Sequence, residues 1–177
     1  MSDAPPIRAA VLTVSDRCSR GEADDTSGPA LAALVRERLG AHVVATACVP
    51  DEVERIIAQL RAWARDEPRP DLLLTTGGTG LAPRDVTPEA TAAVLERRHD
   101  GLLELARRRC YDNTPRTYLS RGEAGTIAQT LIINLPGSQR GATEMLEALL
   151  DILPHAIETL RGDVKDDGRT GEVIHHA

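Results

Sequence analysis

Three short segments of this sequence combine residue types that bind anions. They are Ser15-Asp16-Arg17, Thr76-Gly77-Gly78-Thr79-Gly80 and Pro136-Gly137-Ser138, and each follows an apolar run typical of a buried strand. Glycines let main-chain N–H groups turn toward a phosphate without a Cβ in the way, and hydroxyls add short-range donors. One such turn could equally be a plain strand-to-helix connection. Three together predict a site for a phosphate or carboxylate.

The central glycine turn matches neither of two common nucleotide-binding fingerprints. Gly80 is not followed by Lys and Ser or Thr, as it would be in a Walker loop, and the spacing is not GxGxxG. The kinase and dehydrogenase hypotheses therefore lose their main support.

Four arginines lie in or beside these turns: Arg17, Arg84, Arg121 and Arg140. Two unit charges ~4 Å apart attract by ~1 kcal/mol in water and by ~4 kcal/mol at a partly desolvated surface. Local arginines could therefore hold an anion although the formal net charge of the chain is -6. Each arginine alone could instead be a solvated loop residue.

Two aspartates at predicted strand-to-helix junctions could face the same ligand. Asp85 lies shortly after the glycine turn, and Asp51 follows another predicted strand. Carboxylates beside a phosphate repel it unless a cation lies between them, so the pair suggests Mg²⁺ bridging to phosphate oxygens. Asp51 has an alternative role as a helix cap, paired with Glu54 in a capping box. Thr87 is the better cap for the helix after Asp85, so capping does not explain Asp85.

Histidines and cysteines suggest no further chemistry. No two histidines have metal-binding spacing within a helix, and Cys18, Cys48 and Cys110 are isolated. Neither a zinc cluster nor a disulfide framework is expected, which favours a reducing cytoplasm.

The elements that would position these residues alternate along the chain. Strands are expected at 7–15, 42–49, 71–76 and 130–135, and helices at about 28–39, 53–63, 87–109 and 145–153, with Pro154 interrupting or restarting the last one. Loops are expected at 16–27 and 110–125. This order predicts an α/β fold, a three-layer α/β/α sandwich with a mostly parallel central sheet. Such sheets bind ligands beyond the carboxyl ends of their strands.

Composition favours one soluble domain. The 177 residues predict a single domain over 1–162 and a charged, mobile C-terminal tail over 163–177. Trp63, Tyr111 and Tyr118 are the only aromatic residues, and the acidic balance repels polyanions, so no nucleic-acid partner is expected. No leader-like segment and no run of ~20 apolar residues is present, so no membrane partner is expected either.

Several motifs, taken in order, resemble the MogA/MoaB family of molybdenum-cofactor biosynthesis. The match covers about residues 7–162 and rests on Ser15-Asp16-Arg17, Asp25 to Pro29, Thr75 to Gly80, Pro83 to Ala90, Ser120-Arg121-Gly122 and Asn134 to Ser138. One departure is Gln139, where the family commonly has Pro.

The resemblance implies an α/β domain, often trimeric, that adenylylates molybdopterin with Mg-ATP and releases pyrophosphate. Asp51 and Asp85 match the family's catalytic carboxylates, and the Mg²⁺ role is placed on the same pair. The expected substrate- and nucleotide-binding residues are Ser15, Asp16, Arg17, Thr76, Gly77, Gly78, Thr79, Gly80, Arg84, Thr87, Ser120, Arg121, Pro136, Gly137 and Ser138. A homotrimer and a molybdenum-insertion partner protein are expected. The alternatives are a molybdopterin-binding scaffold without adenylylation activity and a hydrolase of a nucleotide-containing cofactor.

Overall fold

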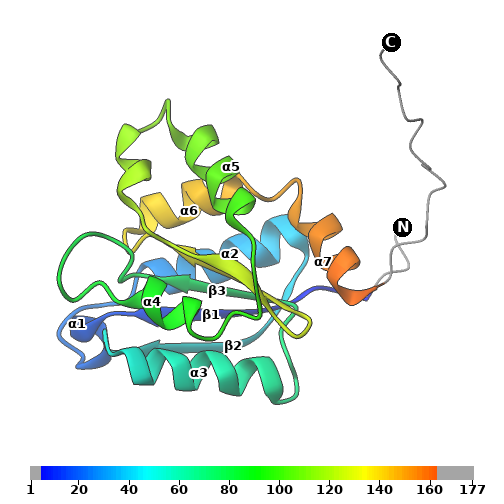
Figure 1. The fold of residues 1–177 in the computed structure, drawn as a ribbon, viewed down its shortest axis with the longest axis horizontal. Coiled ribbons are helices and arrows are strands. Elements are labelled where there is room, and N and C mark those ends of the chain that lie inside the picture. Colours follow the sequence, from blue (N-terminus) through cyan, green and yellow to red (C-terminus); the bar gives the residue numbers. More distant parts are fainter. Residues whose placement is uncertain (1–4, 163–177) are drawn as a thin grey trace, which may run out of the picture.

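A six-stranded sheet in the order β2-β1-β3-β6-β5-β4 forms the centre of the molecule (Figure 1). The structure is a computed structural model that describes residues 5–162, so the tail predicted at 163–177 lies outside the described residues. Four strands are parallel: β2 (His42–Val49), β1 (Arg8–Val14), β3 (Leu72–Thr76) and β6 (Thr130–Leu135). At one edge, β5 (Ala124–Ile127) pairs antiparallel with β6, and β4 (Arg97–Arg98) pairs antiparallel with β5. The predicted α/β fold with a mostly parallel sheet is confirmed.

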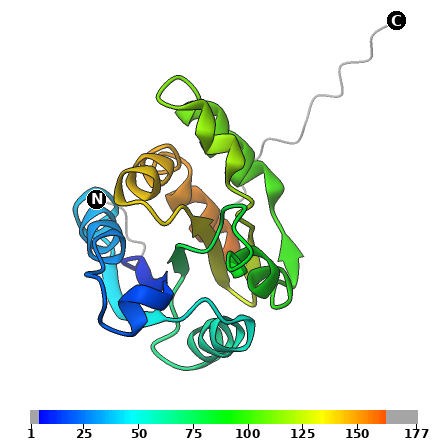
Figure 2. The ribbon, with the colours of Figure 1, turned by 90° about the vertical axis from the view of Figure 1, so that its left-hand side faces the viewer.

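Alternate residues of the central strands face opposite layers of helices. Val11 and Leu74 pack with α2 (Ser27–Leu39), α5 (Asp100–Cys110), α6 (Gln139–Glu147) and α7 (Leu153–Arg161). Leu12 and Leu73 pack on the other face with α3 (Val53–Arg65) and α4 (Thr87–Ala92). Figure 2 shows α2 and α3 on opposite sides of the sheet. Since both faces are covered, the central strands are apolar throughout, as parallel strands usually are.

The helical segments expected over 87–109 are present, but a short strand separates them. The chain leaves α4 after Ala92, forms the two-residue strand β4 and starts α5 only at Asp100. Both residues of β4 are exposed, so the strand has no apolar alternation by which a sequence pattern could identify it. Its pairing with β5 decides its conformation.

Two expected loops also contain regular structure. The segment 110–125 contains the 3-10 helix η1 (Pro115–Leu119) and the first residues of β5, and the segment 16–27 contains α1 (Asp16–Ser19). Gly125 weakens the strand signal of β5, but a Cβ there would collide with the carbonyl oxygen of Arg97, so close strand pairing requires glycine. Pro154 lies in the first turn of α7, which confirms that the helix restarts there.

Within residues 5–162, no helix combines the length and the apolar character needed to cross a membrane. Cys18, Cys48 and Cys110 are all free thiols.

Candidate functional site

The three segments predicted to bind an anion meet at the carboxyl edge of the parallel strands. Ser15, Gly78 and Gly137 line one pocket of about 270 Å³, together with both aspartates singled out from the sequence. The segments follow β1, β3 and β6, which are neighbours in the sheet. Because these strands are parallel, their carboxyl ends lie at one edge.

The glycine turn after β3 has a backbone conformation that residues with a Cβ rarely adopt. Gly77 and Gly78 have φ angles of 102° and 62°, in the left-handed region. A Cβ on Gly78 would collide with the hydroxyl of Thr87 and lie 2.9 Å from Asp51 Oδ1. The turn is therefore held against the start of α4 and the loop after β2, and its conformation brings backbone close to the Asp51 carboxylate.

Asp51 joins the ends of β1 and β2 rather than capping a helix. Its Oδ2 accepts a hydrogen bond from the backbone N–H of Asp16 at 2.8 Å, and its own N–H donates to Asp16 Oδ1 at 3.1 Å. Helix α3 begins at Val53 and has Glu52 as its N-cap residue, without a side-chain cap. The predicted capping role is wrong because the side chain turns across to the neighbouring loop.

The pKa of Asp51 is raised above the ordinary value of an aspartate. Burial is the main cause, and the negative charges of Asp16 and Asp85 raise it further, while the Asp16 amide and the Arg84 cation act in the opposite direction. The carboxylates of this pocket thus repel one another, and a cation bound between them would relieve the repulsion.

The oxygen donors of the pocket fit Mg²⁺ as part of a substrate complex. Within residues 5–162, no group of three or more His, Cys, Asp or Glu side chains could hold a metal by itself. Mg²⁺ commonly uses only one or two protein carboxylates, with phosphate oxygens and waters completing the shell. Asp51 and Asp85 fit that pattern, and Asp85 Oδ2 also accepts from Ala82 N at 2.8 Å.

Thr87 supports the glycine turn and is not a helix cap. Its hydroxyl donates to the carbonyl of Gly77 at 2.8 Å, and its N–H donates to the carbonyl of Gly78 at 3.0 Å. Val86 is the N-cap residue of α4, so the expected capping role is wrong. The turn folds back over the start of the helix, where the hydroxyl satisfies a buried carbonyl.

Two of the four arginines singled out from the sequence hold the segment between β3 and α4 in position. Arg84 forms an ion pair with Asp16, with Nη2 2.7 Å from Oδ2, and this hydrogen bond is the main reason that the pKa of Asp16 is lowered. Arg121 donates to the carbonyls of Gly80 and Asp85, both at 2.7 Å, and pairs with Glu89.

The other two arginines contribute less to this pocket. Arg17 is exposed, and Arg140 pairs with Glu144 on α6.

The remaining predicted residues divide between the pocket and its surroundings. Those that line it are Ser15, Asp51, Thr76, Gly77, Gly78, Asp85 and Gly137. Those that do not are Asp16, Arg17, Thr79, Gly80, Arg84, Thr87, Ser120, Arg121, Pro136 and Ser138. Arg121 N donates to Thr79 O at 2.8 Å, so the Ser120-Arg121 segment braces the glycine turn from outside. Pro136 and Ser138 line a separate, neighbouring pocket, and Gln139 is the first residue of α6.

Sequence reasoning missed one wall of the pocket, formed by Thr13 and by the segment before α2. The Thr13 hydroxyl donates to Asp25 Oδ2 at 2.6 Å, and the other carboxylate oxygen accepts from Gly28 N at 2.9 Å. A Cβ on Gly28 would lie 2.5 Å from both Thr13 Oγ1 and Asp25 Oδ2. The polar segment Asp25-Thr26-Ser27-Gly28-Pro29 was the available signal, and its other pocket residues are Thr26 and Ser27.

Fold and pocket together define an α/β domain with a pocket beyond the carboxyl ends of its parallel strands, which is the place where such sheets bind ligands. The model of the family described as "Probable molybdopterin binding domain" matches residues 10–155. The chain therefore belongs to the MogA/MoaB family of molybdenum cofactor biosynthesis proteins, as the motifs predicted.

Three relatives illustrate the relationship. The solved structure of the molybdopterin biosynthesis enzyme MoaB from Thermus thermophilus is 49% identical, with a TM-score of 0.82, and the match covers 88% of this chain and 97% of that one. Molybdopterin adenylyltransferase of Helicobacter pylori strain J99 is 37% identical over 89% of both chains. Molybdenum cofactor synthesis protein cinnamon of Drosophila melanogaster is 43% identical over 89% of this chain, which spans only 26% of that longer protein.

Proposed function

We propose that this chain is a molybdopterin adenylyltransferase, which transfers AMP from Mg-ATP to the terminal phosphate of molybdopterin. The observation that carries the proposal is the single pocket in which the glycine turn, Ser15 and Gly137 meet two aspartates. The name of the Helicobacter pylori relative, which is matched over nearly its whole length, supports the same reaction.

The reaction needs no nucleophile from the protein. A phosphate oxygen of molybdopterin attacks the α-phosphorus of ATP, a new P–O bond forms, and the bond to the β-phosphate breaks. Pyrophosphate leaves with the electron pair of the broken bond. The protein contributes by aligning two anionic substrates and by stabilising charge that develops at phosphorus.

Main-chain groups of the pocket suit this task. The left-handed backbone of Gly77 and Gly78 brings main chain to the pocket without a Cβ, and Gly137 lies so close that an added Cβ would be 3.1 Å from Gly77 Cα. The N–H of Gly77 itself donates to the carbonyl of Leu135 at 3.2 Å, so Gly77 shapes the turn and is not a free donor. In this proposal Arg121 and Arg84 do not contact the substrates; they hold the segment between Gly80 and Asp85 in place. Rigid donors cost little reorganisation when charge develops.

Asp51 and Asp85 would hold Mg²⁺ together with the phosphates of the substrates. Bound Mg²⁺ supplies neutralisation of phosphate charge and polarisation of the phosphorus centre. Both carboxylates keep hydrogen bonds from backbone amides, Asp16 N for Asp51 and Ala82 N for Asp85, which orient them toward the pocket.

We also propose a cytoplasmic homotrimer that passes its product to a molybdenum-insertion protein, as the family resemblance implies. Light scattering of the purified chain measures the mass directly. A monomer or dimer at working concentration would contradict the trimer.

The test is AMP transfer by the purified protein, followed as pyrophosphate release with Mg-ATP and molybdopterin. Asp85→Asn should lower turnover at least ~100-fold because it removes a charge that acts on the transferred group. Asp66→Asn, an exposed aspartate at the end of α3, is the matched control and should keep full turnover.

Other outcomes identify the alternatives. Full turnover by Asp85→Asn would contradict the role of this residue. A wild-type chain that binds molybdopterin but neither binds Mg-ATP nor releases pyrophosphate is a binding protein, and one that releases AMP without a pterin is a hydrolase.

A further inference from the structure

Two of the three cysteines lie beside the same wall of the carboxyl-edge pocket, the one that holds Asp51. Cys18 is on α1 and lines that pocket, whereas Cys48 is in β2 and lines an adjoining pocket of about 440 Å³. Thr13 and Asp25 line both pockets, so both cysteines neighbour the same hydrogen-bonded pair. The two cysteines are distant in the sequence and come together because β2 lies next to β1.

A short series of contacts connects the two cysteines. Cys48 lies opposite Thr13 in the parallel pair formed by β1 and β2. The next residue, Val49, accepts a hydrogen bond from Ser15 N at 2.9 Å, and Ser15 Oγ accepts from Cys18 N at 3.2 Å. A strand and a capped helical turn therefore hold the two thiols near each other.

The electrostatic surroundings of Cys48 agree with this placement. The residue is exposed as a whole, yet burial around its sulfur is the main reason that its pKa is raised to about 11. The charge of Cys18 makes the next contribution to this pKa. Because the interaction between two charges weakens with distance, that contribution indicates that the sulfurs are neighbours.

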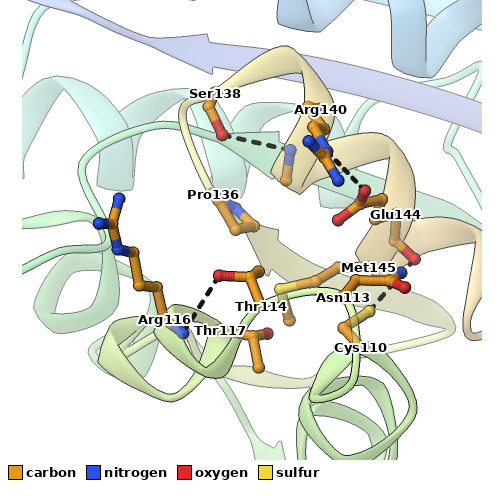
Figure 3. A pocket seen from close by; sticks show the side chains of 11 residues that line it. Cys110, Asn113, Thr114, Arg116, Thr117, Pro136, Ser138, Arg140, Glu144 and Met145 are labelled. Carbon is orange, nitrogen blue, oxygen red and sulfur yellow. Dashed lines mark hydrogen bonds and ion pairs between the residues drawn. The ribbon is translucent and has the colours of Figure 1, made fainter.

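Cys110 lacks the access to solvent that oxidation needs. It is 3% exposed on α5, and its sulfur donates to the carbonyl of Glu144 at 3.5 Å (Figure 3). Cys18 is half-buried and Cys48 is exposed, so a small oxidant can reach both. Cys110 therefore serves as the reference thiol of the same chain.

We propose that peroxide oxidises Cys18 and Cys48 to a reversible disulfide that displaces α1 and inactivates the carboxyl-edge pocket. The Cys18 thiolate attacks one oxygen of hydrogen peroxide, the O–O bond breaks, and the departing oxygen takes a proton to leave as water. The Cys48 thiol then attacks the sulfur of the resulting sulfenic acid, the S–S bond forms, and the S–O bond breaks with loss of a second water. Two thiols lose two electrons in all, and one peroxide becomes two waters. Disulfides of reducing compartments are usually transient and redox-sensing, as this one is.

The bond changes the pocket because both thiols are free in this structure. Joining the sulfurs draws α1 toward β2, and α1 begins at Asp16. Asp16 holds Asp51 through two hydrogen bonds and Arg84 through an ion pair. A shift of α1 therefore disturbs a carboxylate on which the proposed transfer depends. The effect on AMP transfer rests on the proposed function, whereas the disulfide and the shift of α1 do not.

The experiment is oxidation of the purified chain with a small excess of hydrogen peroxide, followed by tryptic mass mapping without reductant. Peptides 18–20 and 39–55 should appear joined and lighter by two hydrogens, while Cys110 stays open to alkylation after unfolding. The amide hydrogen of Asp16, which donates to Asp51 Oδ2, should exchange at least ~10-fold faster in the joined chain. Pyrophosphate release should fall at least ~10-fold, since small misplacements of a site are costly, and dithiothreitol should restore it.

Cys48→Ser is the decisive variant because Cys48 does not line the carboxyl-edge pocket. In the reduced state it should match wild type, and after peroxide it should show neither the joined peptides nor the reversible loss of activity. Cys110→Ala is the matched control and should behave as wild type in both respects. Circular dichroism checks that each variant is folded.

Three results would overturn the inference: no joined peptides from the oxidised wild-type chain, unchanged exchange of the Asp16 amide in the joined chain, or full pyrophosphate release by the joined chain. Failure of the proposed function is distinguishable from these. A reduced chain that transfers no AMP, but forms the joined peptides with faster exchange at Asp16, loses only the proposed function. A chain that transfers AMP equally well before and after peroxide loses only the disulfide switch.

Discussion

Asp71 and Asp51 lie at opposite ends of the central sheet and have opposite electrostatic surroundings. Asp71 precedes β3 and is 3% exposed, with Arg161 Nη2 2.6 Å from its Oδ2. Burial by itself would raise the pKa of Asp71, but hydrogen bonds from Arg161 and Arg8 lower it to about 2. Asp51 follows β2, and burial together with neighbouring carboxylates raises its pKa.

The difference separates a carboxylate that stabilises the fold from one that is available to a ligand. At the amino end, two arginines from distant parts of the chain satisfy Asp71 and tie α7 and β1 to β3. At the carboxyl end, within residues 5–162, the side-chain cation that lowers the pKa of Asp51 is Arg84, which is itself bonded to Asp16. Incomplete compensation of charge is typical of functional sites, where a substrate or cation completes the interaction.

Asp51→Asn should give the largest effect on activity. We expect AMP transfer to fall ~1000-fold, because the substitution removes a charge next to the reacting phosphates. The melting temperature should not fall, since the amide oxygen can still accept from Asp16 N and the repulsion from Asp16 and Asp85 is lost. Pyrophosphate release and thermal unfolding measure the two effects. A fall in melting temperature of about 10 °C would make Asp51 a structural residue.

Asp71→Asn should show the reverse behaviour. The free energy of unfolding should fall by about 3 kcal/mol, because two arginines would lose a buried anionic partner. Turnover per folded molecule should stay unchanged. Urea unfolding and the same transfer assay test this, with Asp66→Asn as the exposed control. Loss of turnover in the folded variant would contradict the purely structural role of Asp71.

The acid stability of the chain should depend on Asp71. A carboxylate whose pKa is 3.8 when unfolded and about 2 when folded contributes about 2 kcal/mol above the unfolded pKa, and this contribution is lost as pH falls from 3.8 toward 2. Asp51 has the opposite sign, since its raised pKa favours the folded state at low pH and loses that contribution as pH rises. The free energy of unfolding, measured with urea at several pH values between about pH 5 and about pH 3, should therefore change less with pH in Asp71→Asn than in wild type. An equal slope would show that Arg8 and Arg161 do not lower this pKa.

Arg84→Gln should have the smallest effect. The Arg84 side chain is 63% exposed, so loss of its ion pair with Asp16 should change the melting temperature by less than about 2 °C. The KM for ATP should rise by about threefold, because the segment before Asp85 is less firmly held. Arg109→Gln breaks the exposed pair with Asp151 away from the site and should leave KM unchanged. Equal KM values for the two variants would show that Arg84 does not position the site.

Local sequence patterns predicted most of the fold. The apolar runs of β1, β3 and β6 and the helical spacing of α2 and α3 identified the parallel core, since each pattern depends on a few consecutive residues. The sequence patterns did not identify strands β4 and β5, because β4 consists of two exposed residues and β5 contains Gly125. Their conformation comes from pairing with neighbouring strands, which no local pattern encodes.

The sequence also determined that polar and glycine-rich turns follow three strands, and parallel strands necessarily bring such turns to one edge. Only the tertiary structure decided which groups meet there. Asp16 and Asp51 are 35 positions apart, and their hydrogen bonds exist because β2 lies next to β1. The place of Thr117 and Glu144 in a separate pocket likewise depends on how α5 packs against both α6 and η1. Element types follow from neighbours in sequence, whereas the partners of a side chain follow from strand order and layer packing.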